Sequence, residues 1–162
     1  GFFRRTSGFI HIIRNSMDHG IETPEERLKK GKAPEGRLQM ELFENDGYLI
    51  LKYSDDGRGL NLKKLKDLGL RLNLIKNDSV LTPKEICELI FLSGISTSSQ
   101  VTDISGRGVG MGAVKEYLER VQGRIAIELV NDPLQEPGFA PFELQIKIPA
   151  RFWAPPFRLE CA

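Results

Sequence analysis

The sequence lacks the features that mark several common classes of protein. Its two cysteines, Cys87 and Cys161, lie far apart and belong to no CxxC or Cys/His cluster. This argues against a disulfide framework and predicts free thiols in a reducing compartment. No apolar run approaches the ~20 residues that a membrane span requires, and we find no signal-peptide pattern. We therefore expect a cytoplasmic protein without direct membrane insertion.

The sequence also lacks an excess of charge of one sign. Its 23 basic and 22 acidic residues leave a formal net charge of +1. A nucleic-acid-binding protein usually shows a basic patch or arm, and none stands out, so no nucleic-acid partner is expected. Internal repeats and low-complexity segments are absent. The 162 residues, of which 40% are hydrophobic, are enough for one domain with its own core.

Hydrophobic periodicity and turn signals predict a regular order of helices and strands. The helices are expected near 6–20, 24–30, 83–92 and 111–121, and the strands near 38–44, 48–53, 124–130 and 142–148; a further stretch of mixed, mainly helical character follows Gly59. Hairpin strands, helices and a closing pair of strands predict an α/β two-layer sandwich, with helices over one face of a mixed β-sheet. We place this domain at residues 1–149 and a C-terminal tail at 150–162.

The first expected helix has a stripe of polar residues that could bind a metal ion. His11, Asn15 and His19 are spaced by four residues, and Asp18 lies one turn from Asn15. Residues at this spacing lie along one side of a helix. The amide oxygen of Asn15 is a hard ligand suited to Mg²⁺, which often shares phosphate oxygens. The alternative is a solvated helix face, and the stripe alone leaves both open.

A second motif, Asp55-Asp56-Gly57-Arg58-Gly59, follows an expected strand. A carboxylate fixed at Asp55 could accept a hydrogen bond from an exocyclic amine such as that of adenine. Gly57 and Gly59 would let the backbone approach the ring without a Cβ in the way. A polar β-turn without a ligand is the alternative interpretation.

A third motif, Gly106-Arg107-Gly108-Val109-Gly110-Met111, opens an expected helix. Glycines at alternate positions can turn backbone N–H groups toward an anion, and the helix N-terminus adds partial positive charge. The dinucleotide-binding fingerprint does not apply, because a helix and not a strand precedes this motif. The sequence contains no G-x-x-x-x-G-K-[ST] phosphate loop either. A flexible loop without a ligand is the alternative.

Together these motifs resemble the ATP-binding catalytic domain of CheA-type, or chemotaxis, histidine kinases. The resemblance covers about residues 8–149 in both order and spacing. The segments similar to the N, G1, F and G2 boxes of that family are 11–22, 55–59, 89–97 and 101–111. The resemblance implies the Bergerat-type fold that these kinases share with gyrase, MutL and Hsp90, including an ATP lid.

The resemblance also implies roles for individual residues. Asn15 would bind Mg²⁺ and phosphate oxygens, Asp55 would recognise the adenine amine, and His11 would polarise or deprotonate the phosphate acceptor. The remaining residues expected to line the ATP site are Asp18, His19, Gly57, Gly59, Ser105, Gly106, Arg107, Gly108, Val109, Gly110 and Met111.

The implied activity is transfer of the γ-phosphoryl group of Mg-ATP to a histidine on a separate phosphotransfer domain. A response regulator, and receptor or coupling proteins acting through other domains, are the further partners implied. Two alternatives remain open. In place of the family's Gly-Thr pair before the last strand the chain has Pro137-Gly138-Phe139-Ala140-Pro141, which would suit an ATP-binding module without transfer activity. An ATPase of the gyrase/MutL type is the other, although those enzymes generally have Glu where this chain has His11.

Overall fold

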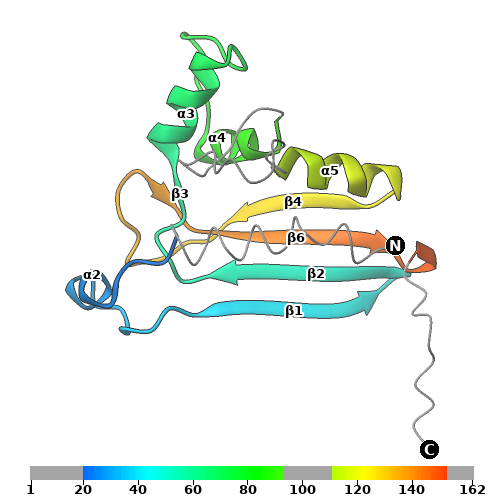
Figure 1. Cartoon of the computed structure of the whole chain (residues 1–162), viewed down its shortest axis with the longest axis horizontal. Helices are drawn as coiled ribbons and strands as arrows, with labels where there is room; N and C mark the ends of the chain where they lie inside the picture. Colours follow the sequence, from blue (N-terminus) through cyan, green and yellow to red (C-terminus); the bar gives the residue numbers. More distant parts are fainter. Residues whose placement is uncertain (1–19, 93–110, 153–162) are drawn as a thin grey trace, which may run out of the picture.

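A computed structural model describes residues 20–92 and 111–152 of the chain. Its main sheet has four strands in the order β1-β2-β6-β4. They are β1 (Leu38–Asn45), β2 (Tyr48–Asp55), β6 (Phe142–Pro149) and β4 (Arg124–Leu129). Each of these pairings is antiparallel. The predicted closing strands therefore do pair, and β6 inserts between β2 and β4 (Figure 1).

The first hairpin follows directly from its turn residues. Asp46 and Gly47, between Asn45 and Tyr48, both have positive φ angles, of 49° and 74°. Two consecutive residues in the left-handed region match the twist of antiparallel strands, and Asp-Gly adopts this conformation at little cost. The predicted hairpin is confirmed, and β2 continues two residues beyond its expected end, to Asp55.

Four helices lie outside the sheet within the described residues: α2 (Pro24–Lys29), α3 (Leu62–Arg71), α4 (Pro83–Glu88) and α5 (Met111–Arg120). Short 3₁₀ turns follow α4 (Leu89–Phe91) and β6 (Ala150–Phe152). The helix expected to continue through Phe91 therefore tightens after Glu88, although its apolar residues keep the same side buried.

Both Pro-initiated helices have the start signal that the sequence contains. In α2 the Thr23 side chain accepts a hydrogen bond from the Glu26 N–H, while the Glu26 carboxylate accepts from the Thr23 N–H. Thr82 and Glu85 form the same reciprocal pair at α4. Each capping box satisfies two backbone donors that the first helical turn would otherwise leave unpaired.

The core lies between one face of the sheet and the helices. Tyr53, Leu144 and Ile127 are opposite one another on β2, β6 and β4, so their side chains share a face. Leu65 of α3 and Cys87 of α4 are buried in the same cluster. Helices therefore cover one face of the sheet, and the predicted α/β two-layer sandwich is confirmed.

A small second sheet was not predicted. It pairs β3 (Leu60–Asn61) with β5 (Phe139–Ala140), which are each two residues long. Strands this short show no hydrophobic alternation, so the sequence gives no signal for them. Their pairing brings the segment after the Asp-Asp-Gly-Arg-Gly motif beside the segment before β6.

Candidate functional site

Asp55 is the last residue of β2, and the chain turns directly after it. Its Oδ1 atom accepts a 2.9 Å hydrogen bond from the backbone N–H of Gly57. This local turn, in which an aspartate side chain bonds the backbone two residues later, fixes the carboxylate relative to the strand. No side chain or backbone group of the described residues donates to Oδ2. As far as residues 20–92 and 111–152 are concerned, Oδ2 can accept a hydrogen bond from a ligand.

Gly57 lies against the backbone of Gly20. A Cβ at position 57 would be 2.3 Å from the Gly20 carbonyl oxygen and 2.8 Å from Asp55 Oδ1, which is closer than non-bonded atoms approach. The next residue, Arg58, donates its backbone N–H to the same Gly20 oxygen over 2.9 Å. The turn after β2 is thus joined to the residue that follows His19 in the sequence.

Gly59 contacts the opposite side of the site. Its φ angle is +81°, and a Cβ there would lie 2.2 Å from the carbonyl oxygen of Ala140. The Arg58 guanidinium lies over the Phe139 ring, 5.6 Å from its centroid. The segment that stands in place of the family's Gly-Thr pair therefore packs directly on this turn. The two glycines are required by close backbone contacts on both sides, which a solvated polar turn would not need.

Asp56, for which the sequence predicted no separate role, is fixed by residues that precede β1. Its carboxylate accepts from the Arg27 guanidinium at 2.8 Å and from the Arg37 backbone N–H at 2.8 Å. Burial raises the pKa of Asp56. These hydrogen bonds and the charges of Arg27 and Lys32 lower it by a larger amount, so the pKa lies below its usual value. The Asp56 side chain is therefore a structural anion, whereas Asp55 Oδ2 receives no hydrogen bond from the part of the chain that the structure describes.

Met111 begins α5 and packs against the core cluster that includes Tyr53. The predicted helix is therefore confirmed from Met111 onward. The other predicted site residues lie outside the described residues: His11, Asn15, Asp18, His19, Ser105, Gly106, Arg107, Gly108, Val109 and Gly110. Among the predicted set, the structure thus places Asp55, Gly57 and Gly59 in one turn.

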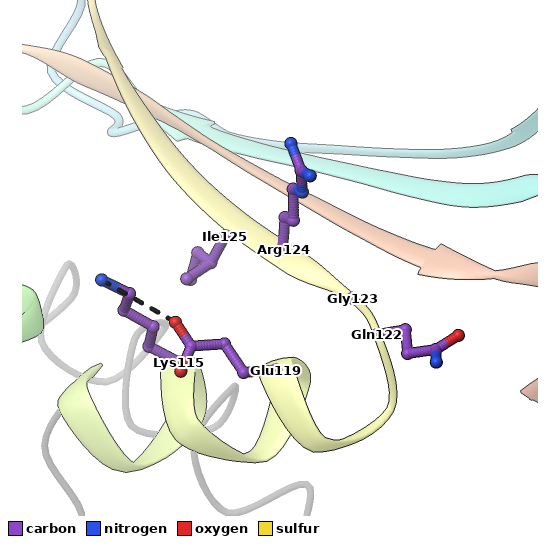
Figure 2. Close-up of a pocket in the computed structure, with 6 residues that line it drawn as sticks. All are labelled: Lys115, Glu119, Gln122, Gly123, Arg124 and Ile125. Carbon is purple, nitrogen blue, oxygen red and sulfur yellow. Dashed lines mark ion pairs between the residues drawn. The ribbon is translucent and has the colours of Figure 1, made fainter.

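An open pocket between α5 and β4 lies away from this turn (Figure 2). Lys115 and Glu119 line one side of it and Arg124 lies on the other. Arg124 and Ile50 both face Lys147, so the pocket is level with Ile50, five residues before Asp55 on β2. That is roughly 16 Å along the strand. The pocket belongs to the opposite end of the sheet.

Within residues 20–92 and 111–152, no group of three or more His, Cys, Asp or Glu side chains is placed to hold a metal ion. Asn15, the predicted Mg²⁺ ligand, is outside that part. None of the helices described is long and apolar enough to cross a membrane.

Comparison with known proteins places these observations in a family. Residues 5–150 match the model of the histidine kinase-, DNA gyrase B- and HSP90-like ATPases. The chain belongs to this ATPase family. The match includes all the predicted site residues and both sides of the turn after β2.

Curated relatives narrow the similarity to one branch of the family. The chain is 43% identical over 121 residues to chemotaxis protein CheA of Bacillus subtilis, which is 74% of the chain and 18% of that protein. It is 43% identical over 117 residues to CheA of Rhizobium meliloti, covering 72% of the chain and 15% of the relative. For CheA of Salmonella typhimurium the identity is 41% over 118 residues, with shares of 73% and 17%.

The chain spans less than a fifth of the length of these three CheA proteins. The predicted resemblance to the CheA-type ATP-binding domain is confirmed, and with it an ATP-binding domain of the histidine-kinase class. The turn at Asp55 fits an adenine nucleotide chemically, because it offers a fixed acceptor oxygen beside closely packed glycine backbone.

Proposed function

We propose that this domain transfers the γ-phosphoryl group of Mg-ATP to a histidine on a separate phosphotransfer domain, which then supplies a response regulator. The observation that supports it best is the Asp55 carboxylate, fixed at the end of β2 with Oδ2 free of protein donors within the described residues. Membership of the ATPase family and similarity to CheA support the same assignment.

Asp55 has the role of recognising adenine. The exocyclic amine of adenine donates a hydrogen bond, and Asp55 Oδ2 can accept it while Oδ1 remains bonded to the Gly57 N–H. Guanine and hypoxanthine have a carbonyl at the corresponding position, which would face the carboxylate unfavourably. Close backbone packing at Gly57 and Gly59 keeps the acceptor in place.

The chemical step forms a bond between an imidazole nitrogen of the acceptor and the γ-phosphorus, and it breaks the bond from that phosphorus to the bridging oxygen of ADP. Asn15 is the proposed Mg²⁺ ligand, and an ion held there would neutralise charge on the phosphates. His11 takes the proton that the attacking imidazole loses. The domain contributes mainly alignment, since phosphoryl transfer needs little covalent chemistry from the protein.

The decisive experiment incubates the domain with Mg-ATP labelled on the γ-phosphate, with and without an added CheA-type phosphotransfer domain. Acid-labile, base-stable phosphate on the added domain is the expected result. Release of free phosphate without an acceptor would instead assign a gyrase/MutL-type ATPase. Nucleotide binding with neither release nor transfer would assign a binding module, the interpretation that the Pro137–Pro141 segment keeps open.

A further inference from the structure

Six ionised side chains gather beside the turn after β2, and Glu22 is at their centre. Its carboxylate has no solvent exposure and lies 3.4 Å from Arg27, 3.4 Å from Lys30 and 3.1 Å from Lys32. Asp56 and Glu136 complete the group through ion pairs with Arg27 and Lys30. The basic and acidic members balance, three against three. We call these residues the Glu22 cluster.

The cluster is buried to an unusual degree for charged groups. The Arg27 side chain is 1% exposed and that of Lys32 is 7% exposed. Burial raises the pKa of Glu22, but hydrogen bonds from its own backbone and from Lys32, together with the charges of Lys32 and Lys30, lower it below the ordinary value. A cluster of buried charges is costly to remove from water, and apolar residues of similar volume in its place often stabilise a protein equally well or better. Stability alone therefore explains the cluster poorly.

The cluster ends on the backbone of the nucleotide-facing turn. Lys32 Nζ donates to the carbonyl oxygen of Asp56 at 2.9 Å and to that of Gly57 at 3.4 Å. Arg27 Nη1 donates to the same Asp56 carbonyl at 3.3 Å, and its Nη2 donates to the Asp56 carboxylate. These are the two residues that directly follow Asp55. Apolar side chains could not satisfy their carbonyl groups.

A second connection reaches the other side of the site. Lys30 donates to both Glu22 and Glu136, and Glu136 accepts through its carboxylate while its carbonyl oxygen accepts from the Phe139 N–H. Phe139 and Ala140 form the segment on which Gly59 packs. In Figure 1, α2 lies at the end of the sheet where β2 terminates. The Glu22 carboxylate is thus connected through Lys32 to the backbone of the turn after β2, and through Lys30 to the segment that packs on Gly59.

We propose that Glu22, Arg27 and Lys32 are positioning residues for the nucleotide: they fix the backbone at Asp56 and Gly57, and so the direction of the Asp55 carboxylate. The inference rests on the proposed adenine-reading role of Asp55. It assigns selectivity for the base to charged residues outside the pocket. The predicted consequence is that Lys32 affects discrimination between bases and not merely stability.

The test compares ADP with inosine diphosphate, in which a carbonyl replaces the exocyclic amine, by calorimetry on the full chain. Wild-type protein should favour ADP by roughly 10- to 100-fold, the range of a hydrogen bond to a charged acceptor. Lys32→Met keeps the length of the side chain and removes its charge. This variant should bring the ratio of the two affinities close to one, mainly by weakening the binding of ADP. Lys32→Arg, which keeps a buried donor, should restore most of the ratio.

Lys29→Met is the matched control, because Lys29 lies three residues before Lys32, at the end of α2, but is 73% exposed and pairs with Glu25. It should leave the ratio unchanged. A lower melting temperature for Lys32→Met with an unchanged ratio would show a purely structural role and overturn the inference. Should Lys32→Met fail to fold, Arg27→Lys keeps the charge but loses the fork that holds Asp56. An unchanged ratio in that variant overturns the inference equally.

The wild-type measurements separate this inference from the proposed function. Failure of the wild-type chain to bind ADP would contradict ATP binding itself. Equal affinity for both nucleotides would contradict the role of Asp55. Discrimination by the wild type that persists in the cluster variants would contradict only the positioning role of the Glu22 cluster.

Discussion

The backbone N–H of Arg58 donates a 2.9 Å hydrogen bond to the carbonyl oxygen of Gly20. This bond joins the turn after β2 to the end of the segment that contains His11, Asn15 and His19. Gly57 allows the approach, because any Cβ there would overlap the same carbonyl. Two motifs that are separate in the sequence are therefore adjacent at this point of the fold.

Gly59→Ala should destabilise the protein far more than glycine replacement at a free turn. The new Cβ would overlap Ala140 O, at 2.2 Å, and would also strain a φ angle of +81°. Gly47→Ala is the control, with a φ of +74° and nothing within 4 Å of the added carbon. We expect a loss of about 1–2 kcal/mol for the control and at least twice that for Gly59→Ala. Equal losses in urea unfolding would show that the contact with Ala140 is unimportant.

Glu22→Gln should change how stability depends on pH. The folded-state pKa of Glu22 is lowered from its reference of 4.5, so its contribution is present above that pH and is lost as pH falls through the folded-state value. At pH 7 the variant leaves buried cations with one partner fewer, and should lose about 3–5 kcal/mol. The difference from wild type should begin to narrow near pH 4.5, the unfolded value, and should disappear as the pH falls through the lower folded-state pKa, where Glu22 becomes neutral in the folded protein.

Urea unfolding at several pH values between 7 and 3 measures this difference. Glu35→Gln is a suitable control because Glu35 is exposed, and it should follow the wild type at every pH. A gap between Glu22→Gln and wild type that stays constant over the whole range would mean that Glu22 is not the titrating group.

The local features of this fold were predictable and the long-range ones were not. Thr23 and Thr82 each precede a proline and lie three residues before a glutamate, which is enough to locate two helix starts. Asp46-Gly47 likewise fixes a hairpin, since the turn depends on its own residues. The pairing of β3 with β5 depends on contacts between distant segments, and two-residue strands contain no periodic signal.

The candidate site shows the same division. Asp55, Gly57 and Gly59 were predicted because a family motif covers them. The burial of Glu22 and Arg27 and of the Lys32 side chain was missed, because residues 22–36 are rich in charged residues and such segments are usually solvated. Their regular spacing of five residues was the available signal, but only the folded chain shows that Arg27 and Lys32 bond Asp56 and that Glu22 pairs with both.

Cys87 should be almost unreactive in the folded protein. The side chain is fully buried in the core, and burial, with a smaller contribution from the charge of Glu88, raises its pKa to about 11. Thiolate is the reactive form, so little of it exists at pH 8. In a Cys161→Ser background, Ellman's reagent should modify Cys87 only as the protein unfolds in urea. Rapid modification without denaturant would contradict burial of this thiol.

His11→Gln should lower the rate of phosphoryl transfer far more than it weakens the binding of ATP. If His11 takes a proton from the acceptor imidazole, its loss should lower phosphoryl transfer by roughly 10²-fold or more. Binding of ATP should stay within about a factor of ten, because the amide keeps a polar side chain of similar size. Single-turnover transfer to an added phosphotransfer domain measures the first quantity and calorimetry the second. Transfer at the wild-type rate would remove His11 from the chemistry.

Calorimetric titration of the wild type, Asp55→Asn and Asp46→Asn with ADP tests the central claim most directly. Asp55→Asn preserves shape but can present an amide N–H where adenine also offers a donor, so its binding free energy should weaken by about 1–3 kcal/mol. Asp46 lies exposed in the β1–β2 hairpin, and its replacement should leave affinity unchanged. Equal affinity of all three proteins for ADP would contradict the claim that the turn after β2 recognises adenine.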